Sequence, residues 1–155
     1  MTMISASLEE TTKAGMRLGS LLAAGDVVGL TGPLGVGKTA LVGGITKGMG
    51  IEGYAITSPT FVYAHIYKGL VPLHHIDLYR IEKESQLAQL GLEEMLGGEG
   101  VAVVEWFERF PSLWTGDRLE IEMAFQSENK RIIHCKAFGP RPMDLTRKWI
   151  PTNEN

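Results

Sequence analysis

The stretch "LTGPLGVGKTALV", Leu30 to Val42, decides the fold of this chain of 155 residues. Its central residues, Gly32 to Thr39, match the pattern G-x-x-x-x-G-K-[ST] in full. Glycines allow a tight turn in which successive backbone N–H groups point inward and surround phosphate oxygens. The apolar run "DVVGLTG" before the loop predicts a strand, and the residues from Lys38 to about Met49 predict a helix. The stretch therefore predicts a phosphate-binding loop, or P-loop, and with it a nucleotide site.

The loop and the helix after it predict contacts to both a nucleotide and its Mg²⁺ ion. We expect Lys38 to reach the β and γ phosphates and the Thr39 hydroxyl to ligate Mg²⁺. The helix contains three glycines, Gly43, Gly44 and Gly48, which we expect to allow close packing against the sheet. The predicted nucleotide-binding residues are Gly32, Pro33, Leu34, Gly35, Val36, Gly37, Lys38, Thr39 and Ala40.

An acidic side chain at the end of a buried strand must complete such a metal site. Glu105 ends the apolar run "VAVVE", whereas Asp77 ends the less apolar run "PLHHID". The pattern favours Glu105 over Asp77 as the acid on the metal side, and the other acid is then available to orient the attacking water. Thr60, in "TSPT", is a candidate switch residue near the γ-phosphate, although this segment alone is equally typical of a turn before a strand.

The rest of the chain predicts a small α/β domain: a P-loop NTPase-like, three-layer arrangement with parallel core strands and added antiparallel hairpins. A helix is expected over residues 7–24, and a second over residues 84–96, broken near Gly91. One hairpin is expected from "TFVYAHIYKG" and "LVPLHHIDLYR", another from "RLEIEMAF" and "RIIHCKAF", and only the strands at residues 26–32 and 101–106 look parallel. We assign residues 1–138 to a single ATPase domain and residues 139–155 to a peripheral tail.

Composition excludes several classes of protein. A net charge of −3 and a pI near 5.8 argue against a broad basic face for nucleic acid. The single cysteine, Cys135, suits a reducing compartment, and the sequence shows neither a secretory signal nor an apolar run long enough to span a bilayer. We therefore expect a cytoplasmic protein without a membrane partner. The four histidines, His65, His74, His75 and His134, lack the spacing of a zinc site.

Three classes of P-loop protein remain to be separated. A small-molecule kinase needs an arginine-rich lid, usually as an insertion, and the sequence shows none. A GTPase of the Ras type needs a late Asn/Thr-Lys-x-Asp motif, and the strings "TKAG" and "NKRI" both lack the aspartate. An ATPase whose hydrolysis is read by a partner remains, with a non-catalytic nucleotide-dependent scaffold as the alternative and a small-molecule kinase third.

The ordered motifs resemble those of the TsaE (YjeE) family. They are "GPLGVGKTAL", "SPTFVYAHIY", "HHIDLYRI", "LAQLGLEEML" and "VAVVEWFERF", and the resemblance runs from about Ser7 to about Ala124. It implies an ATPase that uses ATP and Mg²⁺ to drive or reset a TsaD–TsaB-type complex, with tRNA contacted indirectly through that complex. The complex makes N6-threonylcarbamoyladenosine at position 37 of tRNAs that read ANN codons. On this reading the second substrate of the chain is another protein.

The resemblance also implies roles for individual residues. Thr60 is similar to a switch residue near the γ-phosphate, and Asp77 to a catalytic or water-positioning acid. Glu105 is similar to the acid on the Mg²⁺ side, and Trp106 to a tryptophan beside the nucleotide or at the partner face. With Lys38, the expected catalytic residues are therefore Asp77 and Thr60, and the expected metal ligands are Thr39 and Glu105.

Overall fold

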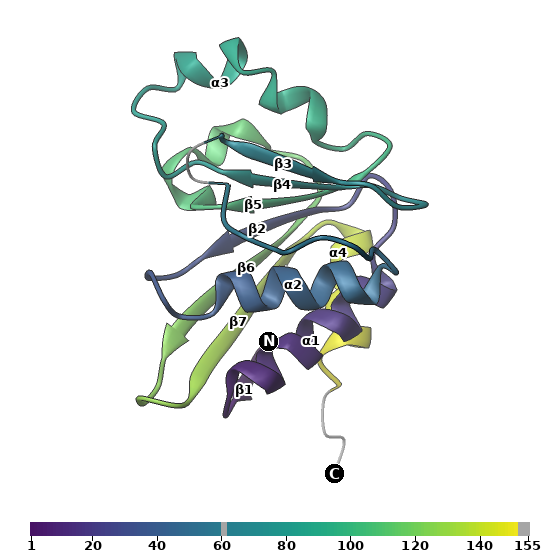
Figure 1. Ribbon diagram of the computed structural model, residues 1–155, viewed down its shortest axis with the longest axis vertical. Coiled ribbons are helices and arrows are strands. Elements are labelled where there is room, and N and C mark those ends of the chain that lie inside the picture. Colours follow the sequence, from purple (N-terminus) through teal and green to yellow (C-terminus); the bar gives the residue numbers. More distant parts are fainter. Residues whose placement is uncertain (60–61, 152–155) are drawn as a thin grey trace.

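A computed structural model describes residues 1–59 and 62–151 and shows a single seven-stranded sheet (Figure 1). Its strands lie in the order β1-β7-β6-β2-β5-β4-β3. The bounds are Thr2–Ser5 for β1, Val27–Thr31 for β2, Ala64–Tyr67 for β3, Leu73–Asp77 for β4, Val101–Glu105 for β5, Arg118–Phe125 for β6 and Arg131–Phe138 for β7.

The core of the sheet is parallel and both of its sides are antiparallel. Strand β2 pairs in parallel with β5 and β6, and β5 pairs in parallel with β4. Strand β3 is antiparallel to β4, and β7 is antiparallel to β6 and β1. The predicted fold class and both predicted hairpins are confirmed. The expectation of only two parallel strands is wrong, because β4 and β6 each pair with their hairpin partner on one side and in parallel with a core strand on the other.

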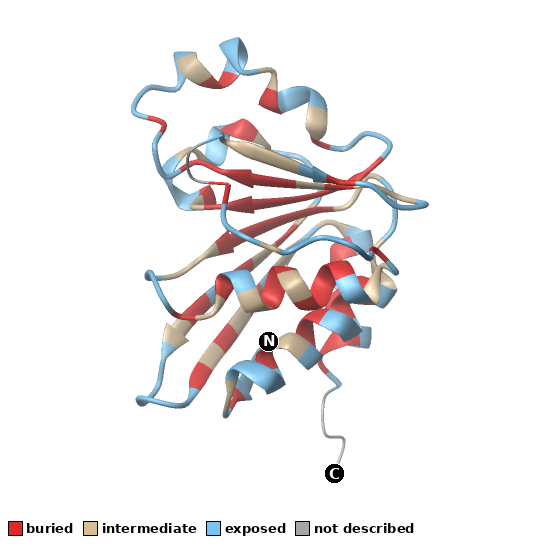
Figure 2. Cartoon of the chain, viewed as in Figure 1, coloured by how far each residue is buried: buried red, intermediate tan, exposed pale blue. Residues whose placement is uncertain are grey.

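Helices cover both faces of the sheet and make it the middle of three layers. Helices α1 (Leu8–Leu21), α2 (Lys38–Gly48) and α4 (Pro140–Trp149) pack on one face. On the other face lie α3 (Ser85–Gln89) and the short 3₁₀ helices η1 (Leu92–Met95), η2 (Phe107–Arg109) and η3 (Pro111–Leu113). Alternate residues of the central strands point to opposite layers, as the two-residue period of a strand requires. Figure 2 shows the resulting buried run through the central strands.

Helices α1 and α2 approach each other through glycines. A Cβ atom built on Gly44 would lie 2.1 Å from the carbonyl oxygen of Thr12, and one on Gly48 would lie 2.1 Å from that of Met16. From the opposite helix, a Cβ on Gly15 would lie 2.3 Å from the Leu41 oxygen. These separations are much shorter than van der Waals contact distances, so no side chain fits there without moving the helices apart. Gly44 and Gly48 thus pack against α1 and not, as the sequence had predicted, against the sheet, while nothing lies within 4 Å of a Cβ built on Gly43.

The predicted peripheral tail from residue 139 is wrong, because most of it forms α4. The face made by Pro142, Leu145, Thr146 and Trp149 is buried, and Trp149 is 0% exposed. The Trp149 Nε1–H group donates a hydrogen bond of 2.8 Å to the Ala14 carbonyl of α1. Proline is tolerated in the first turn of a helix, where its missing N–H has no intrahelical partner. Residues 140–149 therefore belong to the packed structure.

The remaining helices follow their sequence signals. Ser7 caps α1, because its hydroxyl accepts a hydrogen bond of 3.1 Å from the Glu10 amide. The predicted break of the helix over residues 84–96 is confirmed at Gly91, which has a φ of 65° between α3 and η1. Among residues 1–59 and 62–151, no helix combines the length and the apolar character needed to cross a membrane.

Candidate nucleotide and metal site

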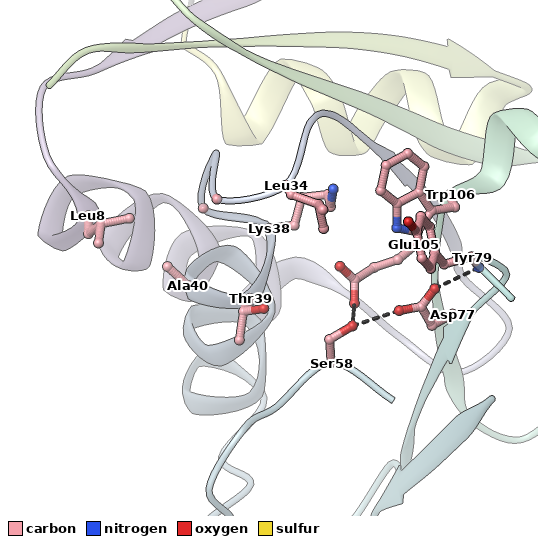
Figure 3. A pocket seen from close by; sticks show the side chains of 12 residues that line it. Leu8, Leu34, Lys38, Thr39, Ala40, Ser58, Asp77, Tyr79, Glu105 and Trp106 are labelled. Atoms are coloured by element: carbon pink, nitrogen blue, oxygen red, sulfur yellow. Dashed lines mark hydrogen bonds between the residues drawn. The ribbon is translucent and has the colours of Figure 1, made fainter. Parts of the chain in front are cut away.

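A cavity of about 340 Å³ lies where the carboxyl ends of the parallel strands meet the N-terminus of α2 (Figure 3). Parallel sheets commonly bind ligands at this end of their strands. The residues that line the cavity are Leu8, Leu34, Gly35, Gly37, Lys38, Thr39, Ala40, Ser58, Asp77, Tyr79, Glu105 and Trp106. The fold thus brings together most of the predicted P-loop residues, both candidate acids and Trp106. Thr60, the predicted switch residue, lies outside the described residues.

The P-loop is held by its own backbone geometry and by a distant strand. Gly37 has a φ of 114°, a left-handed value that side-chain-bearing residues rarely adopt, and it leads directly into α2. Arg131 on β7 is buried, and its Nε–H group donates a hydrogen bond of 3.0 Å to the Val36 carbonyl. Val36 itself is 0% exposed and packs into the core. Val36, one of the predicted nucleotide-binding residues, therefore anchors the loop and does not line the cavity.

Lys38 lies inside the curve of the P-loop. Its ammonium group donates hydrogen bonds to the carbonyls of Gly32 and of Pro33, the second at 3.3 Å. Its Nζ atom also lies 4.3 Å from the centroid of the Trp106 ring, within the range of a cation–π contact. Burial lowers the pKa of Lys38, while the carboxylates of Glu105, Glu108 and Asp77 act in the opposite direction. The site thus holds the partly desolvated ammonium group of Lys38 at the place where we expect phosphate to bind.

Asp77 and Glu105 stand side by side, because β4 and β5 are parallel and place these two residues in register. Each ends its strand, and they are 1% and 2% exposed. The single hydroxyl proton of Ser58 is shared between both acids, with Asp77 Oδ2 at 2.6 Å as the nearer acceptor and Glu105 Oε2 at 3.3 Å (Figure 3). The Tyr79 amide donates to Asp77 Oδ1 at 2.8 Å. Two buried carboxylates are therefore oriented toward the same cavity.

Trp106 follows Glu105 with a left-handed backbone conformation, φ 59°, which is unusual for a residue with a side chain. Conformations of this kind cost of order 1–3 kcal/mol and concentrate at functional sites. Here the turn directs the indole toward Lys38 and Tyr79, whose ring centroid lies 5.1 Å from that of Trp106. The sequence motif predicted Trp106 as a site residue. The structure places its ring at the cavity, beside the ammonium group of Lys38.

The donor set fits a nucleotide-bound Mg²⁺ ion. Mg²⁺ in such sites takes one or two carboxylates together with hydroxyl, water and phosphate oxygens. Glu105, Asp77 and the Thr39 hydroxyl supply that oxygen chemistry around one cavity. In the part of the chain that the structure describes, no cluster of three or more histidine, cysteine or acidic residues forms a cage of protein ligands. The residues therefore suit a metal that arrives with phosphate.

Sequence reasoning missed four residues of this region. Ser58 is the first residue of the motif "SPT", which ends with the predicted switch residue Thr60. The motif therefore contained a signal for Ser58. Leu8 and Tyr79 reach the cavity from α1 and from the turn after β4. Arg131 lies 95 residues from its loop partner, Val36. No local pattern reports contacts between residues so far apart.

Comparison with known proteins agrees with the geometry. Residues 5–133 match the family described as "Threonylcarbamoyl adenosine biosynthesis protein TsaE". The tRNA threonylcarbamoyladenosine biosynthesis protein TsaE of Treponema pallidum is 41% identical over 112 residues, which cover 72% of this chain and 82% of that protein. The protein of the same description from Bacillus subtilis is 40% identical over 134 residues, covering 85% and 83%. The structure described as "Crystal structure of Bacillus subtilus YdiB" superposes with a TM-score of 0.82 at 29% identity, covering 96% of this chain and 93% of that one.

Proposed function

Because this chain belongs to the TsaE family of tRNA threonylcarbamoyladenosine biosynthesis proteins, we propose that it is an ATPase that acts in this modification. The observation that carries the proposal is that Lys38 and the two buried acids Asp77 and Glu105 line one P-loop cavity. Each of these groups has a role when a nucleotide is bound. Packing of the fold alone would not require three ionisable side chains at one buried place.

The residues around the cavity have separate roles in the proposed hydrolysis. The P-loop amides and Lys38 bind the phosphates and stabilise the charge that develops on them during transfer. Thr39 and Glu105 would hold Mg²⁺, which screens the phosphate oxygens. Asp77, whose Oδ2 is fixed by Ser58, orients the attacking water, and Trp106 covers the site. Thr60 remains the proposed switch residue at the γ-phosphate.

The proposed partner is a TsaD–TsaB-type protein complex, and tRNA is reached through that complex. Around the cavity three large apolar side chains face solvent: Leu8 is 50% exposed, Leu34 is 72% exposed and Tyr79 is 43% exposed. Exposed apolar groups at the rim of a site are typical of a surface that another protein covers. Coverage of this rim would exclude water and complete the site, so we expect weak hydrolysis by the chain alone.

The test is ATP hydrolysis measured for the chain alone and after addition of its cognate TsaD–TsaB pair, with Lys38→Ala as the blank. We expect a large rise on adding the pair, and a loss of roughly 10²–10³-fold in Lys38→Ala, as for removal of one transition-state donor. Turnover that is unchanged in Lys38→Ala would overturn the ATPase assignment. Intact ATP binding with no turnover in either condition would instead support a nucleotide-dependent scaffold.

A further inference from the structure

We propose that His75 is a positioning residue that fixes the Glu105 carboxylate for its metal, an inference that rests on the proposed Mg²⁺-dependent function. The Nε2 atom of His75 lies 2.6 Å from Oε2 of Glu105. The two side chains are 0% and 3% exposed. This is a short contact between a fully buried imidazole and the acid assigned to the metal, and the mechanism described above does not use it.

The fold places His75 directly behind the site. On β4 it precedes Asp77 by two residues, so both side chains point to the same face of the sheet. Strand β5 runs parallel, with His75 in register with Val103 and Asp77 in register with Glu105. The imidazole therefore reaches Glu105 from the core side, while the cavity lies at the strand ends. His75 does not itself line the cavity, so its effect must pass through Glu105.

The contact fixes one particular oxygen of Glu105. An ionised carboxylate only accepts hydrogen bonds, so Nε2 of His75 carries the proton and donates it. Ser58, whose proton goes mainly to Asp77, makes the weaker branch of a shared hydrogen bond to the same oxygen at 3.3 Å. Both hydrogen bonds that described residues give this carboxylate thus go to Oε2. In Figure 3 the other oxygen points away from Ser58, which leaves it available on the cavity side.

Packing alone does not account for a histidine at this place. Its second ring nitrogen, Nδ1, is buried without a hydrogen-bond partner among the described residues. An unsatisfied buried polar atom is unfavourable relative to an apolar side chain of similar shape. Its neighbours on the same face are the apolar Leu73 and Val103 and the rings of His65 and Tyr67, whose centroids lie 6.5 Å and 6.1 Å from that of His75. The unsatisfied Nδ1 atom therefore lowers stability, and the interaction that offsets this cost is the hydrogen bond from Nε2 to Glu105.

Hydrogen-bond partners behind metal ligands typically contribute 10–100-fold to metal affinity, because they hold the ligand in its productive orientation. A positioning role and a packing role for His75 therefore predict different losses. If His75 serves packing, its replacement lowers the free energy of unfolding and leaves the metal response unchanged. If it positions Glu105, an apolar replacement keeps the fold and weakens the effect of Mg²⁺ on nucleotide binding.

The experiment measures the dissociation constant of a non-hydrolysable ATP analogue by calorimetry, once in excess Mg²⁺ and once in EDTA. The ratio of the two constants reports how strongly Mg²⁺ supports binding. The variants are His75→Met, which removes the donor, and His75→Gln, whose amide N–H can reach close to the position of Nε2. His74→Gln is the matched control, because His74 is the adjacent residue on β4, points to the opposite face and is in register with Ala102. Thermal unfolding of each variant reports its stability.

We expect the Mg²⁺ ratio to fall about tenfold or more in His75→Met, to recover at least in part in His75→Gln, and to stay at the wild-type value in His74→Gln. The dissociation constant in EDTA should stay the same in all variants, since the P-loop contacts are unaltered. A wild-type ratio in folded His75→Met and His75→Gln would overturn this inference while leaving the ATPase proposal intact. Absence of analogue binding by the wild-type chain would overturn both.

Discussion

The hydroxyl of Ser58 lies 2.6 Å from Oδ2 of Asp77 and donates a hydrogen bond to it. Ser58 belongs to the segment between α2 and β3, whereas Asp77 ends a strand of the sheet. This bond joins the segment that contains the proposed switch residue to the acid that we assign to the attacking water. The same hydroxyl is 3.3 Å from Glu105, so one side chain contacts both acids.

Substitution of Glu105 and substitution of Asp77 are expected to affect different steps. Glu105→Ala should weaken nucleotide binding in the presence of Mg²⁺ more than Asp77→Ala does, because Glu105 is assigned to the metal. Asp77→Ala should leave binding near the wild-type value and reduce hydrolysis by roughly 10²–10⁴-fold, the usual contribution of a general base or a water-orienting group. Calorimetry and single-turnover hydrolysis measure the two effects separately. The reverse order of effects would exchange the roles of the two residues.

The contact between α1 and α2 predicts opposite results for adjacent glycines. Gly44→Ala should lower the free energy of unfolding by about 1–3 kcal/mol or more, because the new Cβ would meet the Thr12 carbonyl at 2.1 Å. Gly43→Ala is the matched control: nothing lies within 4 Å of its Cβ position. It should raise stability by about 0.5–1 kcal/mol through helix propensity. Urea denaturation of the two variants measures both values, and equal stabilities would contradict the close helix contact.

Helix α4 should be required for stability. Trp149→Ala is expected to lower the free energy of unfolding by about 3–5 kcal/mol, since it empties a fully buried site and removes the hydrogen bond to Ala14. Arg147→Ala, at an exposed position of the same helix, should change stability by no more than about 0.5 kcal/mol. The comparison uses chemical denaturation of both variants. A loss equally small in both would mean that the helix is not part of the cooperative structure.

The only cysteine should be unreactive in the folded protein. Burial raises the pKa of Cys135 from 9.0 to about 12. At pH 8 the thiolate, which is the nucleophile, is then about one part in ten thousand of the thiol. Because the folded pKa lies above the unfolded one, this group stabilises the fold fully below pH 9 and loses that contribution as pH rises toward 12. Labelling with iodoacetamide at pH 8 should be negligible in buffer and complete in guanidinium; rapid labelling in buffer would contradict the burial.

The sequence predicted the parts of the site that depend on local chemistry. The P-loop, the two strand-end acids and Trp106 lie inside short motifs whose geometry is set within a few residues. Strand β1 was not predicted, because four residues give almost no periodicity and their partners on β7 lie about 130 residues away. Helix α4 was missed because two prolines and a glycine obscured it. Its buried positions, Pro142, Leu145, Thr146 and Trp149, do follow helical spacing.

The supporting residues of the site could not have been predicted in the same way. His75 and Glu105 meet because β4 and β5 are neighbours in the sheet, and Arg131 meets Val36 because β7 folds back beside the loop. Such contacts depend on strand order, which the motifs did not specify. The four histidines lack the spacing of a zinc site in the sequence, and nothing in that pattern indicated that His75 has the contact with Glu105 on which our positioning proposal rests.

The sheet ends on both sides in a strand of four residues, β1 and β3. An edge strand exposes unpaired backbone groups to which another chain can add a strand, and short edge strands limit such self-association. Here each edge offers only a brief template, so addition of a strand from another copy is disfavoured at both edges. A docking protein has correspondingly little backbone to extend. The partner that we propose would then recognise the chain mainly through side chains, and its selectivity would reside in surface residues that mutation can retune without disturbing the sheet.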